Sequence, residues 1–180
     1  MNLANKITLF RVVLVPVFMA LMMLESTGAR VAALVVFIIA SLSDAADGYI
    51  ARNYNQITNF GKFVDPLADK MLTTAAFLIL LSYGRMSVWA LMIVLAREFM
   101  VSGVRLVAAA DGKVIAASMW GKLKTVSQMV AIIAAIILLL PVFPESAAII
   151  ITDILVWLSV VFTVISGVDY LWKNKSVLKM

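Results

Sequence analysis

The sequence of 180 residues contains no cysteine and no histidine. Without cysteine, the chain has no disulfide framework, no thiolate nucleophile and no cysteine metal site. Without histidine, it lacks the side chain that most often serves as a general base near pH 7. Any proton removed in a reaction would therefore have to pass to a carboxylate whose environment tunes its pKa.

Charged residues are also scarce, at 14% of the chain against 64% hydrophobic residues. In a soluble domain roughly half of the residues are apolar. Apolar runs of about 20 residues recur along the sequence, and each can cross a hydrocarbon core of roughly 30 Å. These runs are continuous rather than alternating, which argues against a β-barrel. We expect an all-α polytopic membrane protein that forms one domain over residues 1–180.

The apolar runs predict six transmembrane helices, with a short interfacial helix over residues 3–11 before the first of them. The expected spans cover residues 12–24, 31–42, 60–81, 88–109, 119–140 and 147–171. With this topology only Arg30 and Arg85 lie on one side, and the other lysines and arginines lie on the opposite side. By the positive-inside rule, both termini face the cytoplasm.

The net charge of +5 fits contact with anionic membrane lipids rather than with nucleic acid. The loops are short and no transit peptide precedes the first span. We therefore expect the chain in the bacterial cytoplasmic membrane.

Four aspartates interrupt the apolar pattern, namely Asp44, Asp47, Asp65 and Asp69. Their spacings of i, i+3 and i, i+4 put each pair on one face of a helix. The first pair ends a helix that arrives at the cytoplasmic side, and the second begins the helix that leaves it. A charge at the centre of a membrane helix costs roughly 3 kcal/mol. One or two divalent cations would remove the repulsion, and all-oxygen ligands favour Mg²⁺ or Mn²⁺.

Small residues and one arginine accompany the aspartates. Gly48, Ala51 and Gly61 would let a helix backbone approach a planar or phosphate-bearing ligand closely. Arg52 offers a bidentate fork for phosphate oxygens. Together with metal ions, these residues suggest a diphosphate site. The alternative is that the aspartates only solvate helix ends at the membrane interface.

The aspartate segment resembles the signature of the CDP-alcohol phosphotransferases. That signature reads D-x2-D-G-x2-A-R-x8-G-x3-D-x3-D, and residues 44–69 match it without a deviation in spacing. Further segments resemble the bacterial branch of this family that makes phosphatidylglycerol phosphate. They are N-x2-T-x2-R at 5–11, D-P-L-A-D-K at 65–70, A-R-E-F at 96–99, G-K-L-K-T at 121–125 and S-G-V-D-Y at 166–170.

The resemblance implies a six-helix fold that usually dimerises, with a cavity open to the cytoplasmic leaflet. The implied reaction transfers the phosphatidyl group from CDP-diacylglycerol to sn-glycerol 3-phosphate and releases CMP. Asp44, Asp47 and Asp65 would be ligands of two divalent metal ions. Asp69 would contribute to the second ion and also take the proton from the acceptor hydroxyl.

The resemblance also implies contacts with CDP-diacylglycerol. Gly48 and Ala51 would pack against the cytidine, and Arg52 would contact the diphosphate, with Gly61 as a further small residue. Thr8 lies on one predicted helix face with Asn5 and Arg11 and could close the nucleotide site. That face could equally be the polar side of an interfacial helix.

Glycerol 3-phosphate is an anion, so its pocket should be basic. Arg97 and Arg105 are eight residues apart and thus about 80° apart around a helix, on one broad face. Arg97 could instead pair structurally with Glu98 or a neighbouring helix, and Arg105 could reach the membrane surface. Lys122 and Lys124 are about 200° apart, so at most one enters the same pocket. The resemblance favours Lys122.

Two other functions compete with this interpretation. A relative with a different acceptor could be a cardiolipin synthase, which uses phosphatidylglycerol, or a phosphatidylinositol phosphate synthase. A divalent-cation transporter could use the aspartates as a transit site. In a transporter the carboxylates would line a path across the membrane, whereas here they cluster at one end beside Arg52, which would repel a passing cation.

Overall fold

The structure is a computed structural model that describes residues 3–24, 26–53, 59–110, 112, 115–116 and 118–175. Within these residues the side chains of residues 3–4, 44–53, 59–66 and 69 are left out of the description.

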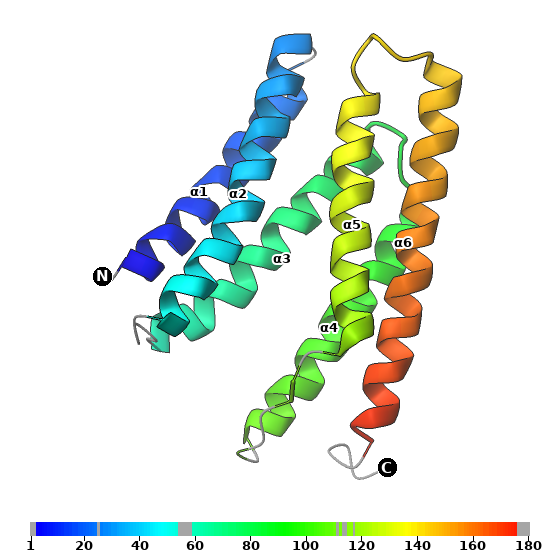
Figure 1. The fold of residues 1–180 in the computed structure, drawn as a ribbon. Coiled ribbons are helices and arrows are strands. Elements are labelled where there is room, and N and C mark those ends of the chain that lie inside the picture. Colours follow the sequence, from blue (N-terminus) through cyan, green and yellow to red (C-terminus); the bar gives the residue numbers. More distant parts are fainter. Residues whose placement is uncertain are drawn as a thin grey trace. The chain divides into compact units, whose positions relative to one another are not determined.

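All regular secondary structure in the described ranges is helical. The helices are α1 (Leu3–Met23), α2 (Thr27–Asn53), α3 (Asn59–Ser82), α4 (Val88–Ala110), α5 (Met119–Leu138) and α6 (Glu145–Lys173) (Figure 1). The last four predicted spans agree with α3 to α6 to within two residues at each end. The expected interfacial segment and the first span are one continuous helix, α1. The second span is longer than predicted, because α2 continues through the first aspartate pair.

Serine side chains cap several of these helices. Ser26 accepts a hydrogen bond from the backbone N–H of Ala29 (3.2 Å) at the start of α2. Ser87 accepts from the backbone N–H of Trp89 in α4 (3.2 Å), and Ser118 accepts from the backbone N–H of Gly121 in α5 (3.1 Å). These hydroxyls satisfy backbone donors that would otherwise lack partners inside an apolar protein.

Three helices in the described part of the chain are long and apolar enough to cross a membrane. They cover Asn5–Met23, Met119–Leu138 and Glu145–Lys173, and shorter apolar helices cover Thr27–Ser43 and Lys70–Ser82. The exposed face of α6 carries Leu158, Val161 and Val168, while Ser159 and Thr163 are buried. Apolar residues outside and hydroxyls inside are expected when lipid is the solvent. The chain is therefore a membrane protein.

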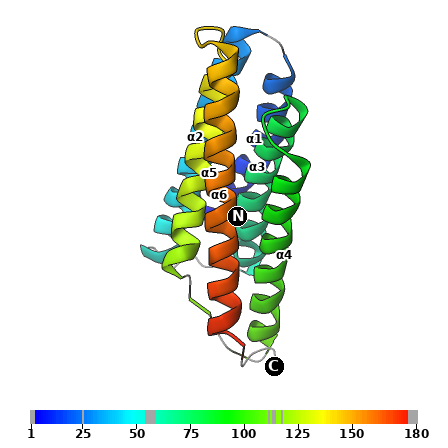
Figure 2. The same ribbon diagram turned by 90° about the vertical axis from the view of Figure 1, so that its right-hand side faces the viewer.

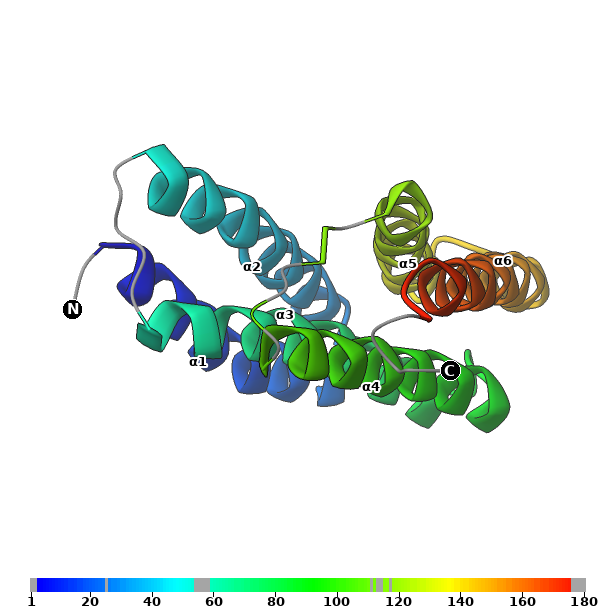
Figure 3. The same ribbon diagram turned by 90° about the horizontal axis from the view of Figure 1, so that it is seen from below.

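The chain forms two compact units. The first contains Met1–Ile79 and Ile136–Pro144, and the second contains Leu80–Ala135 and Glu145–Met180. In the first unit α1 packs on α2, as Figure 3 shows from below. In this interface the rings of Phe18 and Phe37 lie 5.5 Å apart. Arg30 Nη1 donates to the carbonyl oxygen of Leu139 (2.6 Å), which ties α2 to the segment after α5.

In the second unit α4 packs on α6, and α5 also lies beside α6 (Figure 2). Gln128 Nε2 on α5 donates to Thr163 Oγ1 on α6 (3.1 Å), and both side chains are buried. Thr163 in turn donates to the carbonyl oxygen of Ser159 (2.7 Å). Tyr170 packs against Val101 and Val104 of α4. Polar and aromatic contacts thus join all three helices.

We expect the hydrogen bond between Gln128 and Thr163 to stabilise the second unit. A double-mutant cycle with Gln128→Leu and Thr163→Val, followed by unfolding in mixed detergent, should give a coupling energy of about 0.6 kcal/mol, the average for interhelical hydrogen bonds in membranes. The same cycle with Thr125→Val in place of Thr163→Val is the control, because Thr125 bonds only within its own helix. Strictly additive effects of the first pair would contradict the prediction.

Candidate functional site

The aspartate motif lies on two consecutive helices, as the spacing predicts. Asp44 and Asp47 belong to α2, and Asp65 and Asp69 belong to α3. Asp47 comes six residues before the end of α2, and Asp65 comes six residues after the start of α3. Asp47 and Asp65 are therefore equally far along the chain from the connection between the helices. This placement suits a convergence of the two pairs at one end of the first unit.

The side chains of the motif itself lie outside the described residues. They include all four aspartates and Gly48, Ala51, Arg52 and Gly61. The convergence of the carboxylates therefore stays a prediction. Among the side chains that are described, no group of three or more Asp and Glu residues could hold a metal ion.

A polar stripe on α1 lies at the same end of the first unit. Asn5, Thr8 and Arg11 are all buried, and Val15 and Phe18 continue the same stripe towards the apolar half of the helix. The predicted shared face is thus confirmed. Because α1 and α2 are antiparallel neighbours joined by a short turn, the polar half of α1 lies beside the half of α2 that carries Asp44 and Asp47.

A second polar cluster joins α4, α5 and α6 within the second unit. Arg97 Nη1 and Lys124 Nζ both contact Glu98 Oε1, at 3.1 Å and 2.5 Å. The three side chains are only 11%, 9% and 17% exposed, in the order Arg97, Lys124, Glu98. Arg97 Nη2 also donates to Ser166 Oγ on α6 (2.6 Å). The structural pairing considered for Arg97, with Glu98 and with a neighbouring helix, is therefore present.

A glycine on α6 makes room for Arg97. A Cβ atom added to Gly167 would lie 3.1 Å from Arg97 Cγ and 3.3 Å from Met100 Cε. Both separations are shorter than ordinary van der Waals contact, so one side chain would have to move. The glycine of the S-G-V-D-Y segment therefore lets the aliphatic part of Arg97 rest directly on the α6 backbone.

Arg105 is fixed further along the same pair of helices. Its Nε donates to Tyr170 Oη (3.4 Å), and its guanidinium carbon lies 5.8 Å from the centre of the Tyr170 ring. Tyr170 itself is buried against α4. The Arg105 side chain therefore turns towards α6, and it does not point only to the membrane surface.

The two lysines at the start of α5 point in different directions. Lys122 is exposed, whereas Lys124 is buried in the ion pair with Glu98. The expectation that only one of them can enter the cluster agrees with this arrangement, but the one beside Arg97 is Lys124. The residues that sequence reasoning missed are thus Lys124 and the two partners on α6, Ser166 and Tyr170.

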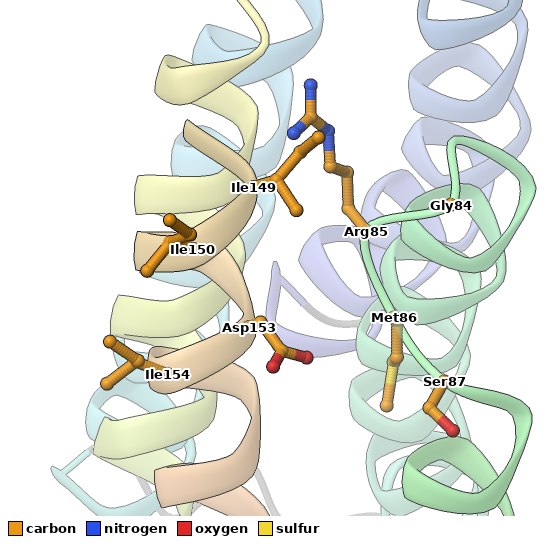
Figure 4. A pocket seen from close by; sticks show the side chains of 8 residues that line it. All are labelled: Gly84, Arg85, Met86, Ser87, Ile149, Ile150, Asp153 and Ile154. Atoms are coloured by element: carbon orange, nitrogen blue, oxygen red, sulfur yellow. The ribbon is translucent and has the colours of Figure 1, made fainter. Parts of the chain in front are cut away.

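A pocket of about 370 Å³ lies at the other end of the second unit (Figure 4). It is lined by residues 84–87 of the turn between α3 and α4 and by Ile149, Ile150, Asp153 and Ile154 of α6. Asp153 is its one carboxylate, and Arg85 reaches Glu145 at 3.8 Å. The apolar lining and the single carboxylate do not suit metal-dependent chemistry.

Comparison with known proteins identifies the family. The family model for CDP-alcohol phosphatidyltransferase matches residues 1–165. The CDP-diacylglycerol–glycerol-3-phosphate 3-phosphatidyltransferase of Bacillus subtilis (strain 168) is 43% identical over 190 residues, which cover 99% of this chain and 97% of the relative. The enzyme of the same name from Rickettsia typhi is 37% identical over 173 residues, covering 94% of each chain. The one from Escherichia coli (strain K12) is 39% identical over 136 residues, covering 73% and 74%.

The chain therefore belongs to the CDP-alcohol phosphatidyltransferase family and is an enzyme of that family. Members of this family generally act with divalent metal ions. Family membership thus agrees with the predicted carboxylate site, without indicating which metal is used.

We expect Gly167→Ala to destabilise the second unit, because the added methyl group would meet Arg97 and Met100. Overpacking of this kind costs about 1–3 kcal/mol. Gly103→Ala on α4 is the matched control, since a Cβ atom there meets nothing within 4 Å. Thermal unfolding in detergent should show a lower midpoint for Gly167→Ala and no loss for Gly103→Ala. Equal midpoints for both variants would contradict the close approach of Arg97 to α6.

Proposed function

We propose that this protein transfers the phosphatidyl group of CDP-diacylglycerol to sn-glycerol 3-phosphate, giving phosphatidylglycerol phosphate and CMP. The observation that carries this proposal is the similarity, over nearly the full chain, to relatives named for that reaction. The uninterrupted aspartate motif and the basic cluster on α4 to α6 support it.

We propose that Asp44, Asp47, Asp65 and Asp69 bind two divalent cations, Mg²⁺ or Mn²⁺. Four carboxylates without histidine or cysteine form a donor set that suits hard cations. When bound, these ions would stabilise negative charge on the diphosphate and on the departing CMP. The positions of the two pairs at the ends of α2 and α3 that adjoin their connection support this assignment.

Asp69 is the proposed general base. The acceptor hydroxyl attacks the phosphorus that carries diacylglycerol, and the bond from this phosphorus to the phosphate oxygen of CMP breaks. Asp69 takes the hydroxyl proton during the attack. A carboxylate in this role is reasonable because the chain contains no histidine.

CDP-diacylglycerol would be held by residues of the first unit. Gly48, Ala51 and Gly61 would allow close approach of the cytidine and the diphosphate, and Arg52 would contact phosphate oxygens. Thr8 would complete this site from α1. Its burial on the stripe that runs beside the motif-bearing half of α2 supports that role.

Glycerol 3-phosphate would be held by residues of the second unit. Arg97 and Arg105 are the proposed contacts with its phosphate, because arginine forms strong bidentate hydrogen bonds with phosphate oxygens. Lys122, exposed at the start of α5, would meet the acceptor as it arrives from water. The buried surroundings of Arg97 support a site that is shielded from solvent.

We further propose how the enzyme lies in its membrane. All six helices would cross the bacterial cytoplasmic membrane, with the first turns of α1 at the interface. Both termini and the aspartate motif would face the cytoplasm, as the distribution of lysine and arginine favours. The enzyme would act as a homodimer and form one catalytic domain.

The reaction is tested by CMP release from CDP-diacylglycerol by purified protein in detergent with Mg²⁺. We expect release with glycerol 3-phosphate and none with phosphatidylglycerol or inositol phosphate. Asp69→Asn should lower the rate at least about 100-fold, the usual contribution of a general base. Asp153→Asn, at the pocket shown in Figure 4, should leave it unchanged.

Each outcome of this assay has a distinct meaning. Release with another acceptor would keep phosphatidyl transfer and overturn the choice of glycerol 3-phosphate. Failure of folded, metal-loaded protein to release CMP with any acceptor would overturn the transfer reaction itself.

Removal of divalent metal with a chelator should abolish activity, and Mg²⁺ or Mn²⁺ should restore it. Titration with Mn²⁺, followed by electron paramagnetic resonance, should give two bound ions per chain. Asp44→Asn should weaken this binding because it removes one anionic ligand, whereas Asp169→Asn on α6 should not. Unchanged Mn²⁺ binding in Asp44→Asn would contradict the assignment of this residue as a ligand.

A further inference from the structure

A single carboxylate oxygen holds two cations in the second unit. Glu98 Oε1 accepts from Arg97 Nη1 and from Lys124 Nζ, which come from α4 and α5. The backbone carbonyl oxygen of Glu98 also accepts a hydrogen bond from Ser102 Oγ, one turn further along α4 (2.6 Å). Two donors that share one oxygen are close enough together to bind oxygens of one phosphate group as well.

The net positive charge of this cluster is smaller than the negative charge of the phosphate group that it is proposed to bind. Arg97, Lys124 and Glu98 together carry a net charge of +1, and Arg105 adds one more positive charge on the same helix. A phosphate monoester carries nearly two negative charges at pH 7. The carboxylate of Glu98 therefore presents to Arg97 and Lys124 the same kind of anionic oxygen that the acceptor's phosphate would present.

The proposed product keeps this phosphate. Glycerol 3-phosphate reacts through its hydroxyl group, so phosphatidylglycerol phosphate leaves with the phosphate monoester intact. Cations without a competing anion would hold product as firmly as substrate, and such uniform binding lowers KM without raising kcat. Product release limits turnover in many enzymes. A carboxylate of the protein that competes for the same donors would weaken the binding of both the substrate and the product.

We propose that Glu98 is the counter-anion of the acceptor-phosphate site. In the empty site Glu98 pairs with Arg97 and Lys124. When the acceptor binds, both cations pair with its phosphate instead, and they pair with Glu98 again when the phosphorylated product leaves. Glu98 is thus a positioning residue, and Lys124 is a phosphate-binding residue in addition to those proposed above. The identity of the acceptor rests on the proposed function, but the competition between Glu98 and a phosphate monoester does not.

A purely structural salt bridge would behave in the opposite way. If Glu98 only joined α4 to α5, loss of its charge would leave two buried cations poorly paired and would destabilise their arrangement. Phosphate binding would then weaken. If Glu98 competes with phosphate, loss of its charge removes a repulsion, and phosphate binding becomes tighter.

The first experiment measures binding of inorganic phosphate and of glycerol 3-phosphate to the purified full-length protein by calorimetry. Glu98→Gln keeps the shape and the hydrogen-bond acceptor but removes the charge, and it should bind both ligands about tenfold more tightly, because the lost charge no longer repels the bound phosphate. Glu98→Asp, with a shorter reach to Lys124, should lie between wild type and Glu98→Gln. Glu145→Gln removes an exposed charge at the far end of α6 and should bind as wild type does.

The second experiment separates binding from turnover. Glu98→Gln should lower both KM for glycerol 3-phosphate and the steady-state kcat, because product leaves more slowly. The first turnover of CMP release, followed by rapid quench, should keep its wild-type rate. Lys124→Met should weaken phosphate binding and raise KM.

Weaker or unchanged phosphate binding in folded Glu98→Gln would overturn the counter-anion proposal. If that variant does not fold, weaker or unchanged binding in Glu98→Asp has the same consequence. Tighter phosphate binding without any CMP release from glycerol 3-phosphate would leave the counter-anion in place and refute the proposed reaction. Normal CMP release with unchanged phosphate binding would refute the counter-anion alone.

Discussion

The pairing of charge inside apolar surroundings is the constraint on which this structure depends. A side chain that carries charge or a hydroxyl must find a partner when no water is near. Several polar residues therefore lie on buried helix faces, as Thr8 and Arg11 do on α1 and Lys124 and Gln128 do on α5. Apolar side chains cover the outside. Within the second unit, polar contacts such as the one between Gln128 and Thr163 join the helices in addition to apolar packing.

The proposed chemistry needs both anionic and cationic side chains. The aspartates, Arg52 and Thr8 all belong to the first unit, whereas Arg97, Arg105 and Lys124 belong to the second. The carboxylates proposed to bind metal and the cations proposed to bind the acceptor's phosphate therefore come from different parts of the chain, while Arg52 is a cation placed among the aspartates. Glu98 is the reverse case, an anion among the basic residues of the second unit.

Sequence reasoning predicted the helices well, because apolar runs bounded by glycine, proline and serine leave few choices. It also predicted the polar face of α1 and the conflict between Lys122 and Lys124. It could not choose between the lysines, since that choice depends on how α5 is rotated. Gln128 is four residues after Lys124, so the two polar side chains share one helix face, and this spacing could have indicated the rotation of α5. Ser166 and Tyr170 were marked only as the two ends of the S-G-V-D-Y segment, because contacts 65 to 69 residues apart leave no local pattern that names their partners.

The two arginines of α4 meet α6 at positions that are closer together than the arginines themselves. Arg97 and Arg105 are eight residues apart, which is about 12 Å along α4, but their partners Ser166 and Tyr170 are four residues apart, about 6 Å along α6. Arg97 reaches a short serine side chain close to the α6 backbone, whereas Arg105 meets the hydroxyl at the end of the long Tyr170 side chain. The direction of both guanidinium groups is therefore set by the helix that receives the arginines as well as by the helix that carries them.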